Sequence, residues 1–399
     1  MRYTYNILVL AAVMALAACE NDDTDFSDII NGNGAGEETL LEYKSIEIDT
    51  TPLTEADEEY ASDDMDYIEN STFSRVIYIT YDGSTATVTG SYSKVDVEAD
   101  GAHVTVTSTQ SGVEYVLSGT SSDGSFKIYS ENKMKITLDD LTLTNPDGAA
   151  INDQCGKSAY IVLADGTVNT LTDGTAYTYT DGEDMKGTLF SEGQIIFSGS
   201  GTLNVNANCR GGIVSDDYIV FRPGNVINIV NTAGNGVKTN DGVFIRGGVL
   251  NITASADGAR GIKTDADISI TGGRTTIINT GGSLIENADT TGSAGIKSDM
   301  AVQMTGGTLN IKNSGEGGKG INCNTDMTFG GGSLNIVTLG TKGANAPKGI
   351  KVDGTIDIEG GYLYSFSYYS DPIDADNGLT IADGYLSLTE ETYLFEIEY

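Results

Sequence analysis

Histidine, tryptophan, proline and cysteine are all scarce in this chain of 399 residues, which contains one, none, five and four of them, respectively. The single histidine, His103, argues against serine–histidine catalytic triads, histidine-ligated zinc and histidine general bases. Basic residues are also few, 22 against 57 acidic ones, and the net charge of −35 would repel a nucleic-acid backbone. Among inorganic partners, this composition favours a hard cation such as calcium.

The apolar run over residues 7–18 is too short to span a bilayer but has the length of a signal-peptide core. Small residues at 17–18 precede Cys19 and resemble the lipobox of bacterial lipoproteins, in which the cysteine becomes the lipidated first residue. The acidic segment 20–23 resembles the signal that exports such lipoproteins. The sequence therefore predicts a signal peptide over 1–18 and attachment to the bacterial outer membrane through the lipid on Cys19, facing the cell exterior.

Acidic residues are concentrated behind Cys19. Residues 19–70 contain 18 of them and a single basic residue, Lys44. Because this segment also lacks hydrophobic periodicity, we predict a flexible acidic tether without a specific ligand over 19–70. A single domain is expected over residues 71–399.

An internal repeat dominates that domain. Each unit begins with an apolar residue, and successive beginnings are 24, 24, 25, 34, 25, 29 and 23 residues apart: Leu189, Ile213, Val237, Ile262, Ile296, Ile321, Ile350 and Ile373. Two apolar residues follow six and eight positions later, and a glycine-containing turn follows at ten and eleven. This alternation is typical of short β-strands. Because a unit of about 24 residues cannot bury its apolar face alone, we predict an all-β, right-handed parallel β-helix.

Carboxylates recur three positions after each beginning, interrupted by Asn240 and Asn324. In a β-helix they would stack about one strand spacing apart, ~4.8 Å, and repel one another unless cations neutralise them. Calcium accepts several oxygen ligands in flexible geometry. The alternative is that these side chains cap turns by accepting hydrogen bonds from backbone N–H groups. The candidate calcium ligands are Asp216, Asp217, Asn240, Asp241, Asp265, Asp267 and Asp299.

A stripe of basic residues accompanies the carboxylates. These residues lie one position after the beginning of several repeat units and just before the beginning of others. In one interpretation its lysines pair with the neighbouring aspartates, each exposed pair contributing ~0–1 kcal/mol. In the other, the stripe forms a groove for an anionic polymer. The candidate ligand-binding cations are Lys238, Arg260, Lys263, Lys297 and Lys351.

An aromatic strip is expected near the end of the domain. Tyr362, Tyr364, Phe366 and Tyr368 alternate with Leu363 and two serines and therefore share the face opposite the buried leucine. Exposed rings of this kind can stack on sugar rings, so all four are further candidate ligand-binding residues. Coverage of the strip by the C-terminal coil or by a second copy would explain the same pattern.

Three cysteines remain besides the lipidated one: Cys155, Cys209 and Cys323. An odd number leaves at least one unpaired within the chain, and their spacing is not that of a metal site. We interpret them as small buried or half-buried residues, with a disulfide between the first two left open.

Several segments carry a resemblance to a known family over roughly residues 75–390: Tyr115–Thr120, Gly148–Ile151, Gly166–Gly174 and the Gly-Ile-Lys-x-Asp…Gly-Gly repeats. They resemble a family of cell-surface carbohydrate-binding β-helix proteins, which is similar to family-nine polysaccharide lyases, contains calcium and is associated with cellulose and polygalacturonate. The resemblance implies calcium near Asp265 and Asp299 and pectin-like ligands. The chain departs from the pattern at Asn240 and Asn324, and at Asn322, where other repeats have lysine.

Three functions compete: a non-catalytic polysaccharide-binding module, a calcium-dependent polysaccharide lyase with Lys263 or Lys297 as base, and an adhesin or structural stalk with a protein partner. A lysine base needs a lowered pKa, whereas Asp265 and Asp299 would hold their neighbours protonated. We therefore predict a monomeric, surface-anchored, non-catalytic lipoprotein that contains calcium and binds plant-type or acidic polysaccharides such as pectin.

Overall fold

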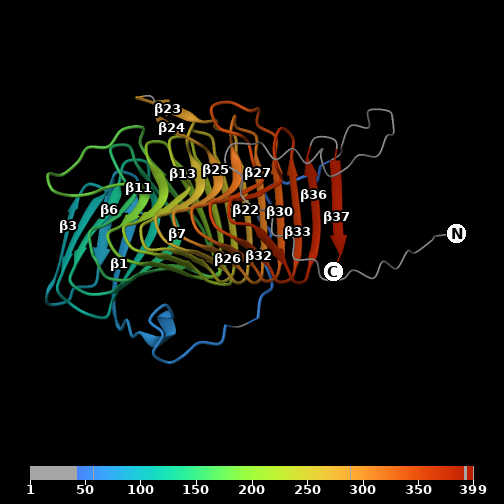
Figure 1. Ribbon diagram of the computed structural model, residues 1–399. Helices are drawn as coiled ribbons and strands as arrows, with labels where there is room; N and C mark the ends of the chain where they lie inside the picture. Colours follow the sequence, from blue (N-terminus) through green and yellow to red (C-terminus); the bar gives the residue numbers. More distant parts are fainter. Residues whose placement is uncertain (1–42, 57, 288, 391–392, 399) are drawn as a thin grey trace, which may run out of the picture.

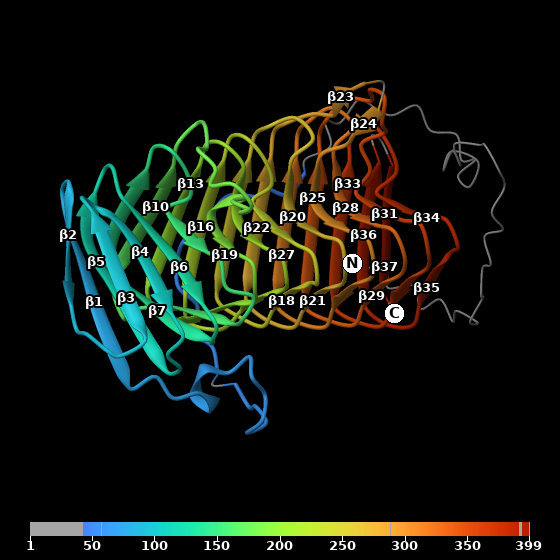
Figure 2. The ribbon, with the colours of Figure 1, turned by 90° about the vertical axis from the view of Figure 1, so that its left-hand side faces the viewer.

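The computed structural model describes residues 43–56, 58–287, 289–390 and 393–398, and it is a long all-β solenoid (Figure 1). The predicted parallel β-helix is confirmed: strands of successive coils pair in parallel, and the beginnings of the repeat align in register, Ile262 opposite Ile296 and Ile296 opposite Ile321. Figure 2 shows the coils stacked along one axis. Within the described residues, no helix is long and apolar enough to cross a membrane.

The strands form three faces, each with one strand per coil. Face 1 consists of β9 (Ala159–Leu163), β12 (Ile195–Gly199), β15 (Ile219–Phe221), β18 (Val243–Ile245), β21 (Ile268–Ile270), β26 (Val302–Met304), β29 (Met327–Phe329), β32 (Ile356–Ile358) and β35 (Leu379–Ile381). These very short strands carry the apolar pair that the repeat places six and eight residues after each beginning.

Face 2 contains the longer strands. They are β10 (Val168–Asp173), β13 (Thr202–Ala207), β16 (Val226–Asn231), β19 (Val249–Ala254), β22 (Arg274–Asn279), β27 (Thr308–Asn313), β30 (Ser333–Thr338), β33 (Tyr362–Ser367) and β36 (Tyr385–Glu390). The last strand, β37 (Tyr393–Glu398), pairs antiparallel with β36 and ends this face.

Face 3 begins every repeat unit. Its strands are β4 (His103–Ser108), β6 (Ser125–Ser130), β8 (Ile151–Asp153), β11 (Gly187–Ser191), β14 (Gly211–Ser215), β17 (Val237–Thr239), β20 (Arg260–Thr264), β25 (Ala294–Ser298), β28 (Lys319–Cys323), β31 (Ile350–Val352) and β34 (Ile373–Ala375). The hairpin of β23 (Leu284–Glu286) and β24 (Asp289–Thr291) lengthens one coil and projects above the others in Figure 2.

The first coils are less regular. They contain β1 (Arg75–Asp82), β2 (Thr85–Thr89), β3 (Val95–Asp100), β5 (Val113–Ser121) and β7 (Met134–Asn145). Strand β7 pairs with β9 through its first half and with β10 through its second half, so it continues two faces around a corner at Asp140, whose φ is 52°. Antiparallel pairing of β1 with β2 and of β3 with β4 ends the stack.

The core is a continuous column of apolar side chains inside the coils, and the beginnings of the repeat, Leu189 to Ile373, belong to it. Buried hydroxyls two positions later form a second internal column, including Ser215, Thr239 and Thr264. The cysteines at 155, 209 and 323 are free thiols, the first and last of them buried, which agrees with their interpretation as packing residues.

Residues 43–56 and 58–70, which we call the N-terminal strap, lie against the outside of the coils (blue in Figure 1). Ile46 is buried against Val337 and Phe366, and Arg222 binds Glu58 and Glu69. The expectation of a flexible tether over 19–70 is therefore wrong for this part of it. The composition of the segment shows its excess of acidic residues, but it does not show that arginines on the solenoid bind them. Residues 1–42, including Cys19, lie outside the described residues.

Candidate functional site

The predicted basic stripe lies on the outer surface of face 3. Lys238, Lys263 and Lys297 are directly opposite one another on β17, β20 and β25, and Lys351 follows on β31 after Asn322. The repeat produces this row because each lysine follows a residue that faces the core, so the lysine itself faces outward.

Most of these lysines are paired with the aspartates of the neighbouring turn. The Nζ atom of Lys263 lies 3.0 Å from Asp265, and that of Lys297 lies 3.4 Å from Asp299. Lys351 is similarly paired with Asp376. The stripe and the carboxylates thus neutralise each other along much of their length, as in the first interpretation of the pattern.

Other candidate calcium ligands serve the turns. Asp217 accepts a hydrogen bond from the backbone N–H of Tyr218 at 2.9 Å, and Asp267 accepts one from Ala301 at 2.9 Å. The amide of Asn240 donates to the carbonyl oxygen of Asp216 at 3.1 Å. The backbone N–H of Asp241 donates to the carbonyl oxygen of Asp217 at 3.1 Å. The contacts of Asp217 and Asp267 are the turn-capping roles that the sequence left open, whereas Asn240 donates to a carbonyl oxygen and Asp241 bonds through its backbone.

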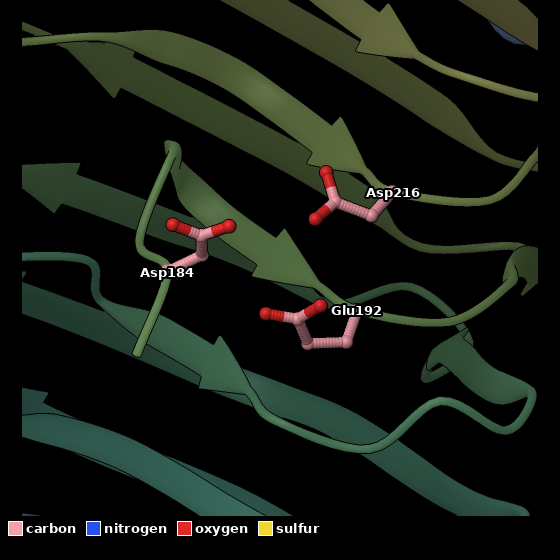
Figure 3. A group of neighbouring side chains, drawn as sticks. All are labelled: Asp184, Glu192 and Asp216. Atoms are coloured by element: carbon pink, nitrogen blue, oxygen red, sulfur yellow. The ribbon is translucent and has the colours of Figure 1, made fainter. Parts of the chain in front are cut away.

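Three carboxylates do converge at one place, as Figure 3 shows: Asp184, Glu192 and Asp216 each have an oxygen within 4.8 Å of the others. Lys186 lies 2.7 Å from Asp184 and 2.6 Å from Asp216. Burial raises the pKa of Glu192, and the neighbouring Asp216 raises it further. Among the described residues, this is the group of acidic side chains whose spacing could hold a metal ion. Of the calcium ligands predicted from the sequence, it includes Asp216 alone.

Three cations of face 3 lack such partners among the described residues: Lys238, Arg260 and Lys319. Arg260 and Lys319 precede equivalent repeat beginnings and align through Ala294. Each is followed by a glycine that faces the core: a Cβ at Gly261 or Gly320 would lie within 2.4 Å of an isoleucine methyl group. The cation before each glycine is therefore turned away from the core.

Neither Arg260 nor Lys319 has a carboxylate oxygen within 4.0 Å in the part of the chain that the structure describes, and the Arg260 Nε atom is buried without a hydrogen-bond partner. Burial lowers the pKa of Arg260. Burial also lowers the pKa of Lys319, and the nearby cations, first of all Lys348 and Lys297, lower it further. We call Arg260, Lys297, Lys319, Lys348 and Lys351 the basic patch. Within it, Lys297, Lys348 and Lys351 are paired with aspartates, whereas the half-buried charges of Arg260 and Lys319 are uncompensated, which is typical of a surface that binds an anion.

A pocket of about 500 Å³ adjoins this face at its other end, where Lys186, Arg210, Val214 and Lys238 line it. The guanidinium of Arg210 lies 5.5 Å from the ring centre of Tyr179, whose side chain is 45% exposed. Three cations thus line the pocket, and an exposed aromatic ring lies beside one of them, Arg210. Sequence reasoning missed Tyr179, Lys186 and Arg210 because they lie in connecting loops, outside the register of the repeat.

The aromatic strip differs from the expectation. Phe366 is only 1% exposed, because Ile46 packs on it and the Tyr43 ring lies 5.4 Å from its own. The backbone N–H of Lys44 donates a hydrogen bond to the Tyr364 hydroxyl at 3.1 Å. The side-chain ammonium group of Lys44 lies 5.3 Å from the centre of the Tyr362 ring.

Tyr368 remains partly exposed, at 38%, and contacts Tyr369. The prediction of an open strip is thus wrong, since alternation shows which residues share a face but not what covers that face. The strip also lies on face 2, whereas the basic patch lies on face 3.

Comparisons with known proteins found one family model and one similar solved structure. Residues 100–392 match the family model described as carbohydrate-binding domain-containing protein. No curated protein matches significantly. A solved structure of a polysaccharide lyase-like protein from C. thermocellum, a gadolinium derivative, is similar with 24% identity and a TM-score of 0.49, covering 72% of this chain and 99% of that one. Because the family model spans well over half of the sequence, the chain belongs to the family of carbohydrate-binding domain-containing proteins.

Proposed function

We propose that this protein is a non-catalytic, surface-anchored lipoprotein that binds an acidic polysaccharide, such as pectin, along the outer surface of face 3. The observation that carries the proposal is the pair of half-buried cations, Arg260 and Lys319, without carboxylate partners among the described residues. A uronate carboxylate would supply the missing negative charge. Charge-assisted hydrogen bonds of this kind are about twice as strong as neutral ones.

The ladder geometry supports a polymer rather than a small ligand. Equivalent positions on successive coils are separated by about one strand spacing, ~4.8 Å, so cations recur along the solenoid axis at multiples of this spacing, with Ala294 and Asn322 as gaps. The exposed Tyr179 beside Arg210 adds an aromatic surface at one end of this row. A linear glycan with one carboxylate on each sugar would meet several of these groups at once.

The environment of Lys319 supports a second candidate function, that of a polysaccharide lyase. A lyase base must lose its proton readily, and Lys319 has the lowered pKa that this role needs, whereas Lys263 and Lys297 are paired with aspartates. Lys319 is therefore the residue to test for catalysis.

The proposal is tested by measuring the affinity of the full chain for polygalacturonate, together with the ultraviolet absorbance of unsaturated products. We expect binding without new absorbance, and weakening of at least about tenfold in Arg260→Gln/Lys319→Gln, since a hydrogen bond to a charged group contributes about 1.5–3 kcal/mol. Lys94→Gln/Lys157→Gln removes the same charge at exposed lysines away from the patch and should bind normally.

Equal affinity of the two double variants would contradict the proposed site. Absorbance that grows with time and is lost in Lys319→Gln would replace binding by lyase activity. Failure of the wild-type protein to bind any acidic or plant-type glycan would favour the adhesin function instead.

We also propose that calcium binds at Asp184, Glu192 and Asp216, where three oxygens converge as hard ligands. The other candidate ligands remain predictions. An ion in large excess over its dissociation constant stabilises the folded state, by ~2.7 kcal/mol at a hundredfold excess. Millimolar calcium should therefore raise the melting temperature of the wild-type protein and of Asp181→Asn, an exposed residue of the same loop, but not that of Asp216→Asn. Equal shifts in both variants would place calcium elsewhere.

A further inference from the structure

We propose that the N-terminal strap occupies a second binding site for a carboxylated polysaccharide, and that the strap must detach before this site can bind. The inference rests on the proposed function only for the chemical class of the ligand. We call the covered surface the arginine site. It consists of Arg222, Arg246, Arg274 and Tyr218, together with the backbone N–H groups of Gly224 and Gly248.

Arg222 obtains its carboxylate partners from the strap. Glu69 accepts hydrogen bonds from Nη1 and Nη2 at 2.9 and 3.2 Å, and Glu58 accepts one from Nε at 2.8 Å. The ring of Tyr67, also in the strap, lies 4.4 Å from the guanidinium. The side chain of Arg222 is thereby only 8% exposed. Bidentate binding of a carboxylate is also the way in which an arginine would recognise a uronate of an acidic sugar chain.

The next coils repeat the arrangement. Asp66 accepts hydrogen bonds from Arg246 Nη2 and from the Tyr218 hydroxyl, both at 2.6 Å. Glu55 accepts from the backbone N–H groups of Gly224 and Gly248, at 3.2 and 2.8 Å. These two glycines occupy equivalent turns, so one carboxylate bridges two coils.

The strap then continues onto face 2, toward the last coils. Asp49 pairs with Arg274 at 3.1 Å, and its carbonyl oxygen accepts a hydrogen bond from Asn251 at 3.0 Å. Asn251 is one step in a row of amides on the outer surface, opposite Asn228 on β16. Figure 1 lets the reader follow the strap from the first coils along the outside of the solenoid.

At the arginine site, the solenoid supplies the hydrogen-bond donors and the strap supplies the acceptors. The solenoid contributes hydrogen-bond donors of three consecutive coils: guanidinium groups, a phenol, an amide and main-chain N–H groups. The strap contributes mainly carboxylates. A polysaccharide with one carboxylate on each sugar offers the same acceptors at a spacing close to that of the coils, ~4.8 Å. The strap therefore occupies the surface as such a ligand would.

The contacts of the strap are also of a kind that can be broken. Its described residues form one short helix, η2 (Ile68–Asn70), and no β-ladder with the coils. At the arginine site its attachment consists largely of side-chain ion pairs, which a competing anion can replace, while Ile46 packs on Val337 and Phe366 farther along the solenoid. Detachment would leave the core of the β-helix intact.

The test compares two triple variants of the full chain. Glu58→Gln/Asp66→Asn/Glu69→Gln removes the carboxylates that bind the arginine site. Glu47→Gln/Glu59→Gln/Asp63→Asn removes the same charge from exposed strap positions that do not contact the solenoid, and serves as the control. Both are made in the Arg260→Gln/Lys319→Gln background, so that binding to face 3 does not obscure the result.

We expect the first triple variant to show faster amide hydrogen exchange over residues 43–70 and at least about tenfold tighter binding of polygalacturonate than the control. The gain follows because an occluded site binds in proportion to the fraction of molecules in which it is free. Adding Arg222→Gln/Arg246→Gln should abolish this gain. Circular dichroism verifies that each variant is folded.

Faster exchange without tighter binding would overturn the inference and leave the strap as a structural clamp. In the wild-type protein, polygalacturonate in excess should accelerate exchange of the strap, and unchanged exchange would also contradict the inference. These outcomes can be told apart from those of the proposed function. If face 3 does not bind the glycan, the gain in affinity at the arginine site can still be measured. If the arginine site shows no gain, binding to face 3 can still be measured.

Discussion

Asp153, on β8, lies in the column of buried side chains two positions after the repeat beginnings, and Ser191 and then Ser215 follow it in register. Its side chain is 1% exposed and accepts hydrogen bonds from the Ser191 hydroxyl at 2.7 Å and from the backbone N–H of Cys155 at 3.0 Å. Burial raises the pKa of this carboxyl to about 7. A carboxyl in this position therefore folds most easily in its protonated form.

This shift predicts a pH dependence of stability. Because the folded-state pKa exceeds the unfolded value of ~3.9, the stabilisation by the bound proton is complete below pH ~4 and is lost as pH rises toward 7. Between pH 5 and pH 8 the wild-type protein should lose about 3 kcal/mol relative to Asp153→Asn, which retains the shape of the side chain. Urea unfolding at both pH values measures this difference.

Asp96→Asn, at an exposed position on β3, provides the control and should follow the wild-type profile. Parallel stability profiles of wild type and Asp153→Asn would show that the carboxyl is ionised in the folded protein.

At the scale of elements, close contact between coils depends on glycine columns. Gly281, Gly315 and Gly340 each lie two residues after a strand of face 2, and a Cβ at Gly315 would lie 1.8 Å from the carbonyl oxygen of Gly281. A Cβ at Gly340 would similarly meet Gly315 at 1.7 Å. No side-chain rotation can relieve such contacts, because the added Cβ would meet a backbone carbonyl oxygen in each case.

Gly315→Ala should therefore destabilise the protein by about 3 kcal/mol, the upper part of the usual range for an overpacked interior. Gly156→Ala is the matched control: no atom lies within 4 Å of its added Cβ, and we expect a change within about 0.5 kcal/mol. Denaturant unfolding distinguishes the two. Similar stabilities would mean that the coils can separate at this turn without loss.

At the scale of the whole molecule, the net charge of −35 has two structural consequences. The carboxylates of the turns pair with the lysines of face 3, as Lys263 does with Asp265, and those of the strap pair with arginines, as Asp66 does with Arg246. These pairings cover many of the cations, whereas the half-buried Arg260 and Lys319 of face 3 are left without a carboxylate partner among the described residues. A protein with this overall charge can still offer positive surface to an acidic glycan.

Membrane attachment is also a property of the whole molecule, and it is predicted from the sequence around Cys19. Cys19→Ser should prevent lipidation and release the protein from the outer membrane, since a lipid chain is its proposed anchor. Cell fractionation and protease treatment of intact cells measure this. Cys209→Ser, which removes a different free thiol, should leave the protein attached and accessible, and release of both variants would contradict the assignment.

The sequence by itself determined the architecture and the family. Beginnings such as Ile262 and Ile296 recur in one register, and that register is the parallel pairing of face 3. It also determined which lysines and aspartates lie beside one another. A repetitive fold permits such inferences because each coil contacts mainly its two neighbours, so spacing along the chain becomes position in space.

Only the tertiary structure decided what covers each surface. The strap crosses the coils through contacts between residues such as Glu58 and Arg222, which are 164 positions apart, and no periodicity encodes such a pairing. It likewise decided that Lys319 is unpaired among the described residues while Lys263 is paired, because burial and counter-ions depend on loops outside the repeat. Local pattern specifies the stacking of the coils, whereas the irregular segments laid over them decide which of their surfaces are covered.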